Sequence, residues 1–324
     1  MEFKIKIWTL SSLLALLIAV YVIGTVFSYQ SIQKRQEEQP LLPGIKLTDV
    51  FSFEIKAGKE SVSVNRNTDG SWSVIIEGRA FPAESTRIEN FLSNVLNLKK
   101  FREITRNREN WKDFDLSPES AKKLILKNEE GEKVTEFMVG KRAIHGEGDY
   151  VRVEGDDTVY MTDSTVAFYL NQGTAYWSHL SVMPEELTGE EIDSIHLEWR
   201  DEGQWGRYLL VRREGEQMDK WVIEGKEEKE LDQTKVDSLA NSIATLRGAK
   251  FIPDPDNTDT GLDSPMLILV VTTGGGNRYE LSVGRVGDGE EKSYFLKRAD
   301  IPFVYELEEW SLKRINKKLE DLLK

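Results

Sequence analysis

The side chains that could catalyse a reaction are few and scattered along this chain. No GxxxxGK[ST] phosphate loop, GxSxG nucleophile motif or HExxH zinc helix occurs in it. Ser120 begins an S-x-x-K pattern that ends at Lys123, as in serine acyl-enzymes, but the supporting SDN and KTG motifs are missing. A hydrolase is therefore the weakest interpretation, and it would require a buried histidine beside Ser120 to act as the base.

Two groups of residues have side chains of the kind that bind metals. The three histidines are His145, His179 and His196. They are far apart in the sequence, so binding would require the fold to bring them together with carboxylates. Residues 254–261 (DPDNTDTG) resemble part of a calcium loop, but the twelfth position from Asp254 is Pro265, where an EF-hand needs glutamate. Turn chemistry explains the segment adequately, and we expect no metal ion, cofactor or catalytic residue.

The composition argues against several functions. The chain has 324 residues, a net charge of −13 and no cysteine. Nucleic-acid binding depends on clustered lysine and arginine, so the acidic balance argues against it. Without cysteine there is no disulfide, no thiol nucleophile and no Cys-ligated zinc.

An uncharged apolar run lies near the N-terminus. Residues 7–27 (IWTLSSLLALLIAVYVIGTVF) form a helix long enough, at about 1.5 Å per residue, to cross a hydrocarbon core of roughly 30 Å. Lys4 and Lys6 precede it, which favours a cytoplasmic N-terminus over 1–6. We expect a single transmembrane helix in the bacterial inner membrane, a tether over 28–48 and an extracytoplasmic remainder. The alternative is a cleaved signal peptide.

The rest of the chain contains an internal repeat. Residues 124–141 read LILKNEEGEKVTEFMVGK and residues 267–285 read LILVVTTGGGNRYELSVGR, each a predicted hairpin that closes in Val-Gly and a basic residue. A segment that runs from an amphipathic helix into a strand precedes each hairpin, over 88–104 and 236–252. The repeat predicts two similar lobes, each with its own core.

The pattern of apolar residues predicts an α+β fold in each lobe. We expect lobe 1 over 49–178 and lobe 2 over 179–324, each a mainly antiparallel β-sheet with one packed helix, because the predicted strands are joined by short connections with glycine. The strands after the helix are predicted at 121–127, 133–139, 149–154 and 157–161, and at 266–272, 277–283, 292–298 and 302–306. Tyr150 is aligned with Tyr294. A C-terminal helix over 308–323 is expected to close lobe 2.

Tryptophans are the remaining candidates for a functional role. Trp72 and Trp221 occupy the same place in the two lobes, each at the start of a strand, and we expect both in the cores. Trp199 and Trp205 flank a polar turn and have no clear counterparts in lobe 1. They form our candidate partner surface.

The repeated pattern resembles a known family. The resemblance rests on one N-terminal membrane helix followed by a pattern that occurs twice: a Leu-Pro entry (Leu42-Pro43 in lobe 1), a hairpin closing in Val-Gly-Lys/Arg and a later Val-Tyr strand. The chain resembles a bacterial family of uncharacterised, duplicated-domain, membrane-anchored proteins. Such proteins are often encoded beside ABC transporters of the gliding-motility type and their auxiliary subunit. The glycine of the family's Gly-Leu-Asp turn is kept as Gly261 and replaced by Asp115 in lobe 1. The resemblance implies a location and partners, and it supplies no catalytic residues.

Two interpretations of function stand ahead of the hydrolase. The first is a non-enzymatic, membrane-anchored extracytoplasmic accessory subunit or scaffold of an ABC-2-type transport system, with the permease or auxiliary subunit as its partner. The second is a binding protein for an envelope glycan or lipid that uses a cleft between the lobes. A large apolar or aromatic-lined cleft would favour the second, and capture of transporter subunits would favour the first.

Overall fold

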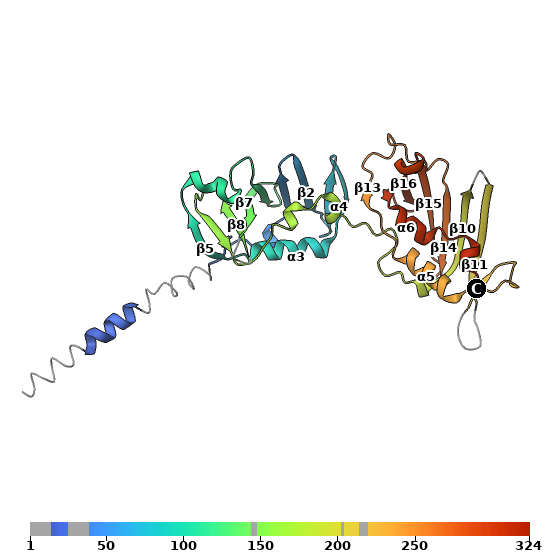
Figure 1. Ribbon diagram of the computed structural model, residues 1–324, viewed down its shortest axis with the longest axis horizontal. Helices are drawn as coiled ribbons and strands as arrows, with labels where there is room; N and C mark the ends of the chain where they lie inside the picture. The colour runs from blue at the N-terminus through green and yellow to red at the C-terminus, as the bar shows by residue number, and fades with distance from the viewer. Residues whose placement is uncertain (1–13, 25–38, 144–147, 202–203, 214–219) are drawn as a thin grey trace, which may run out of the picture. The chain divides into compact units, whose positions relative to one another are not determined.

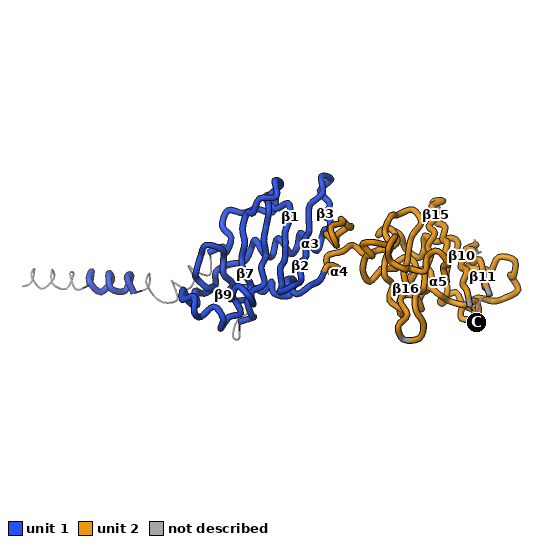
Figure 2. Tube along the Cα trace, turned by 90° about the horizontal axis from the view of Figure 1, so that it is seen from above, with its two compact units in different colours: residues 1–74, 84–173 blue, residues 75–83, 174–324 orange. Residues whose placement is uncertain are grey.

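The computed structural model describes residues 14–24, 39–143, 148–201, 204–213 and 220–324 (Figure 1). Residues 14–24 are helical, and the other parts of the predicted membrane segment and most of the tether lie outside the described residues. Among the described residues, no helix is both long and apolar enough to span a bilayer. The chain divides into two compact units, residues 1–74 with 84–173 (unit 1) and residues 75–83 with 174–324 (unit 2) (Figure 2).

The first sheet has nine strands in the order β4-β3-β2-β1-β6-β7-β8-β9-β5. They are β1 (Ser52–Ala57), β2 (Glu60–Arg66), β3 (Trp72–Ile76), β4 (Arg79–Pro82), β5 (Lys100–Thr105), β6 (Lys122–Lys127), β7 (Lys133–Arg142), β8 (Asp149–Val153) and β9 (Val159–Thr162). From β2 to β5 every neighbouring pair is antiparallel.

Helix α3 (Ser85–Leu96) covers one face of this sheet (Figure 1). Its buried face comprises Ile88, Phe91, Leu92 and Val95, which follow helical spacing. Phe91 packs on Phe53 of β1 with ring centroids 5.2 Å apart. We call this side of each sheet the inner face and the opposite side the outer face.

The second sheet repeats the order of the first without a counterpart of β4, as β12-β11-β10-β14-β15-β16-β17-β13. Its strands are β10 (Ile192–Asp201), β11 (Gln204–Arg213), β12 (Lys220–Ile223), β13 (Lys250–Phe251), β14 (Leu267–Thr273), β15 (Arg278–Val286), β16 (Ser293–Arg298) and β17 (Val304–Leu307). All neighbours are antiparallel. The inner-face helix is α5 (Gln233–Ala244), whose first turn is capped by the Asp232 carboxylate. Two mainly antiparallel sheets with few helices confirm the α+β prediction.

Short helices complete each unit. They are η1 (Leu47–Asp49), η2 (Arg108–Phe114), η3 (Tyr169–Asn171), α4 (Thr174–Trp177), η4 (Gly189–Glu191), η5 (Gly289–Glu291), α6 (Glu309–Ile315) and α7 (Leu319–Leu322). The predicted C-terminal helix is thus two short helices, because the backbone leaves helical geometry at Asn316 (ψ 75°). Leu312 and Leu322 are nevertheless both buried, as the apolar spacing predicted.

One predicted alignment is wrong by a residue. Val139 pairs with Val151 in unit 1, and its counterpart Val283 pairs with Leu296 in unit 2. Tyr150 therefore corresponds to Phe295 and not to Tyr294. Both Tyr150 and Phe295 pack into a small cluster on the outer face of their own sheet. Tyr294 lies one residue away, on the opposite face of its strand.

Candidate functional site

The outer face of each sheet is crossed by an irregular segment that follows the strand after the long helix. In unit 1 this is 106–121, which includes η2, and in unit 2 it is 252–265. The repeated glycines explain how close the segments lie: a Cβ on Gly140 would be 1.9 Å from the carbonyl oxygen of Phe114, and one on Gly284 would be 2.1 Å from that of Thr260. Glycine is needed because backbone packs directly on backbone here.

The next residue in each segment turns the chain in the same way. Asp115 has a left-handed backbone with φ 57°, and Gly261 has φ 64°. After that turn Leu116 is fully buried on the outer face of unit 1, and Leu262 packs in the equivalent cluster of unit 2. Asp115 and Gly261 are therefore equivalent, as the turn motif predicted.

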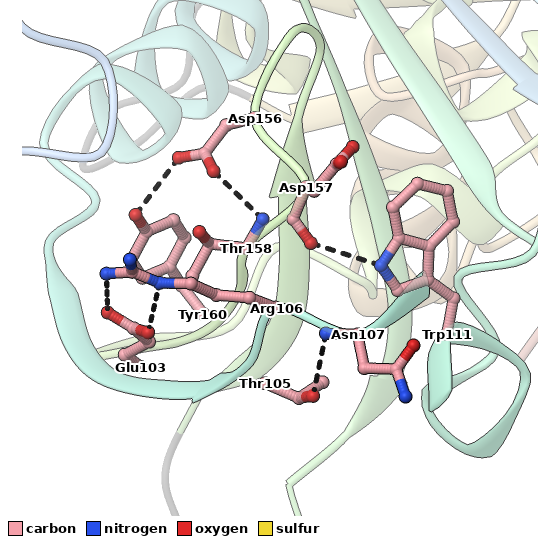
Figure 3. Close-up of polar contacts among 9 residues, drawn as sticks. All are labelled: Glu103, Thr105, Arg106, Asn107, Trp111, Asp156, Asp157, Thr158 and Tyr160. Atoms are coloured by element: carbon pink, nitrogen blue, oxygen red, sulfur yellow. Dashed lines mark hydrogen bonds and ion pairs between the residues drawn. The ribbon is translucent and has the colours of Figure 1, made fainter. Parts of the chain in front are cut away.

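In unit 1 the segment places an indole over a buried cation. The guanidinium carbon of Arg152 lies 3.7 Å from the centroid of the Trp111 ring, and Arg152 is only 8% exposed. Its Nη2 donates to the sulfur of Met138 at 2.7 Å, while its Nε has no hydrogen-bond partner among the described residues. Burial lowers the pKa of Arg152 from its ordinary value. The Trp111 Nε1 donates to the carbonyl oxygen of Asp157 at 3.1 Å (Figure 3).

We call the surroundings of this ring the indole seat of unit 1. Its members, all from the outer face, are Ile104, Leu116, Met138, Arg152 and Val159. Met138 and Arg152 are a cross-strand pair of β7 and β8, so their side chains project from the same face. Trp111 thus closes the outer side of a small second core by cation–π and apolar contacts.

Polar contacts lie beside Trp111 around the β8–β9 hairpin (Figure 3). The Tyr160 hydroxyl donates to Asp156 at 3.0 Å, and the amide of Thr158 donates to the same carboxylate at 2.9 Å. Partial burial alone raises the pKa of Asp156, but these hydrogen bonds outweigh it and hold the pKa below its ordinary value of 3.8. Burial raises the pKa of Tyr160. Both shifts move the pKa away from neutrality, which weakens Asp156 as a base and Tyr160 as an acid.

Unit 2 contains the same seat with different side chains and a different cover. Each seat residue of unit 1 has an equivalent in unit 2: Ile104 corresponds to Ile252, Leu116 to Leu262, Met138 to Ser282, Arg152 to Lys297, and Val159 to Val304. Ser282 and Lys297 are again a cross-strand pair. The covering residues 253–259 (PDPDNTD) contain no aromatic side chain, so this segment supplies no ring in place of Trp111.

A pocket of about 510 Å³ lies at this seat in unit 2. Its walls include all five seat residues, Ile252, Leu262, Ser282, Lys297 and Val304, together with Asp256, Pro302 and Phe303. Arg79, Ala80 and Phe81 of β4 complete the wall, and the Phe81 ring lies 5.7 Å from that of Phe303. The size falls within the range of small-ligand sites, about 300 to 1,000 Å³. Neither seat was predicted, because Trp111 and Arg152 follow no known motif. The signal available in the sequence was the exchange of Met138 and Arg152 for Ser282 and Lys297 between the repeats.

The two tryptophans of the predicted partner surface lie on opposite faces of the β10–β11 hairpin. Trp199 pairs with Gly206 and Arg200 pairs with Trp205, and consecutive residues of a strand project to opposite sides. The Trp199 ring lies over Gly206, where a Cβ would be 2.3 Å from it, and next to Tyr208 at 5.8 Å. Trp205 is 50% exposed. The two rings therefore do not form one continuous surface, and a docking role for Trp205 stays a prediction.

The other candidates from the sequence contact nearby side chains. Ser120 is hydrogen-bonded to Ser117, with their hydroxyl oxygens 2.9 Å apart. His179 lies 3.4 Å from Glu185 and His196 lies 3.3 Å from Glu198, whereas His145 lies outside the described residues. Within 254–261, side-chain oxygens accept local hydrogen bonds: Asp254 from Asn257 and Asp259 from the Gly261 amide. These are the turn contacts that the sequence favoured over a calcium loop.

Trp72 and Trp221 are both buried, as predicted. Each lies beneath an arginine, Arg66 at 5.8 Å and Arg212 at 4.6 Å from the ring centroid. Their partners differ: Trp221 Nε1 donates to Asp237 at 2.9 Å, and Trp72 Nε1 has no partner among the described residues. Both rings serve the cores of their units.

Comparison with known proteins gives one match. No curated protein and no solved structure is similar to this chain. A family model, DUF4340, described as a domain of unknown function, matches residues 72–265 and again residues 221–324. The two matched segments overlap over residues 221–265, and they begin at the equivalent residues Trp72 and Trp221, which is consistent with an internal duplication. The chain therefore belongs to the DUF4340 family.

Proposed function

We propose that this protein is a non-enzymatic accessory subunit, anchored in the bacterial inner membrane by residues 7–27, that holds its two units outside the cytoplasm as a scaffold for an ABC-2-type transport system. The apolar run supports the anchor, since its length suits a bilayer. The observation that carries the scaffold role is that the duplicated positions are structural: Gly140 and Gly284, Asp115 and Gly261, Trp72 and Trp221.

Differences between the units support partner binding on the outer faces. The inner faces are alike, each covered by a long helix over a buried apolar layer. The outer faces share their framework, but unit 1 is closed by Trp111 and unit 2 has a pocket. In a duplicated scaffold, the positions at which the copies diverge are those free to acquire a binding role.

Affinity purification of the tagged full-length chain from membranes in mild detergent tests this function. We expect a transporter permease or its auxiliary subunit to co-purify at a constant ratio to the tagged chain. The matched control carries residues 1–48 on an unrelated globular domain and should capture neither, because the two units are proposed to make the contact. Repeated purification without either subunit, or equal capture by the control, contradicts the proposal.

A further inference from the structure

We propose that the pocket on the outer face of unit 2 binds an aromatic side chain, best an indole, presented by a partner protein. This proposal rests on the scaffold function above and deepens it, because it names the chemistry of one contact. The occupant is inferred from unit 1, in which the same seat is filled by the chain's own Trp111.

The framework of the seat is conserved between the units. Ile252, Leu262 and Val304 supply the apolar wall that Ile104, Leu116 and Val159 supply in unit 1. The indole of Trp111 donates to the carbonyl of Asp157, two residues before Val159. The residue two before Val304 is Pro302, which also lines the pocket. By this equivalence, the Pro302 carbonyl is the acceptor we expect for the N–H of a bound indole.

The charge of the seat also suits an aromatic ring. The face of an indole carries negative potential and attracts a cation. Arg152 provides that cation in unit 1, and Lys297 provides it in unit 2. Lys297 is exposed and forms no ion pair with any residue that the structure describes, so its ammonium is available to a ligand. Phe303, partly buried in the wall, offers a second aromatic surface.

The pocket is open because two changes remove volume. The first change is that the smaller Ser282 replaces Met138. The second is that the covering segment from Ile252 to Thr260 is shorter than the equivalent segment from Ile104 to Phe114, and it has no aromatic residue. Counted back from the equivalent residues Thr260 and Phe114, the third residue is Asn257 in unit 2 and Trp111 in unit 1. Its side chain is exposed and bonded locally to Asp254 at 2.7 Å.

The absence of cysteine from the chain gives a direct assay. In the full-length Ser282→Cys variant, the only thiol lies in the pocket wall, and its alkylation by iodoacetamide reports access to the seat. The probe is acetyl-Ala-Trp-Ala-amide, and acetyl-Ala-Leu-Ala-amide is the control peptide. We expect the tryptophan peptide to slow alkylation in a saturable manner, about fivefold when its concentration is four times Kd, while the leucine peptide has little effect.

A second variant tests whether the peptide protects the thiol from alkylation by occupying the seat or by binding elsewhere. Asn257→Trp in the Ser282→Cys background should fill the seat from within, slow alkylation without peptide and abolish the effect of added peptide. Equal protection by both peptides, no protection by either, or unchanged peptide protection in the double variant overturns the proposal. Co-purification of transporter subunits that survives such a result would leave the scaffold function standing and remove only this contact.

Discussion

At Gly140 and Gly284 a hydrogen takes the place of a side chain, and this lets the outer-face segments pack directly on the strand backbone. Substitution of either by alanine places a Cβ about 2 Å from a carbonyl oxygen, so strand and segment must separate. We expect Gly140→Ala and Gly284→Ala each to lower the free energy of unfolding of their own unit by about 3 kcal/mol. Urea denaturation measures this, with Gly173→Ala as control, because nothing lies within 4 Å of a Cβ there.

Asp115 and Gly261 share a left-handed backbone but differ in the space around them. A Cβ on Gly261 would be 2.6 Å from the carbonyl oxygen of Arg285, whereas aspartate is already present at 115. Asp115→Gly should therefore change stability by less than about 1 kcal/mol, and Gly261→Asp should cost about 2 kcal/mol. The same denaturation experiment compares them. Equal effects of the two exchanges would contradict the difference in space around the two turns.

Arg152 is a buried cation held by an indole and a thioether, with no carboxylate in ion-pair contact among the described residues. Methionine of similar length avoids the cost of burying the charge but loses the cation–π attraction, so Arg152→Met should change stability by no more than about 1 kcal/mol. Arg152→Ala should cost about 3 kcal/mol because it leaves a cavity beneath Trp111. If methionine were as damaging as alanine, the cation–π contact with Trp111 would outweigh the cost of burying the charge, contrary to this expectation.

At the scale of elements, the β8–β9 hairpin ties stability to pH through Asp156. The pKa of Asp156 is lowered in the folded state, so its contribution is present above the unfolded value, about 3.8, and is lost as pH falls through the folded pKa. Asp156→Asn should lower the unfolding midpoint of unit 1 at pH 6, with a difference from the native chain that shrinks below pH 4. A difference that stays constant down to pH 3 would contradict the role assigned to its hydrogen bonds from Thr158 and Tyr160.

Most elements of the fold follow from local patterns in the sequence. Helical spacing predicted α3 and α5, and alternating residues between glycine turns predicted β6 to β9 and β14 to β17 within a few residues. The one-residue error at Tyr150 arose because tyrosines match at 150 and 294, whereas strand pairing sets the true register. The indole seat depends on contacts between η2, β7 and β8. Its residues are distant in sequence, and only the folded chain brings Trp111 over Arg152.

At the scale of the whole molecule, duplication explains both the similarity of the units and the place where they diverge. Each unit is built on an antiparallel sheet with a helix on one face and an irregular segment on the other. The proposed anchor and partner contacts use this repeated framework. Function in this view resides in what was changed after duplication, above all the seat closed by Trp111 and open beside Lys297.

The most direct test of that view compares the two seats by thiol reactivity. In single-cysteine variants, Met138→Cys lies at a position that is 5% exposed, and Ser282→Cys lies in the pocket wall. Normalised to the same variants unfolded in urea, alkylation at 282 should be at least about tenfold faster than at 138. Adding Trp111→Ala to Met138→Cys should remove most of that difference. Equal reactivity at 138 and 282 with Trp111 intact would contradict a seat that is filled in one unit and open in the other.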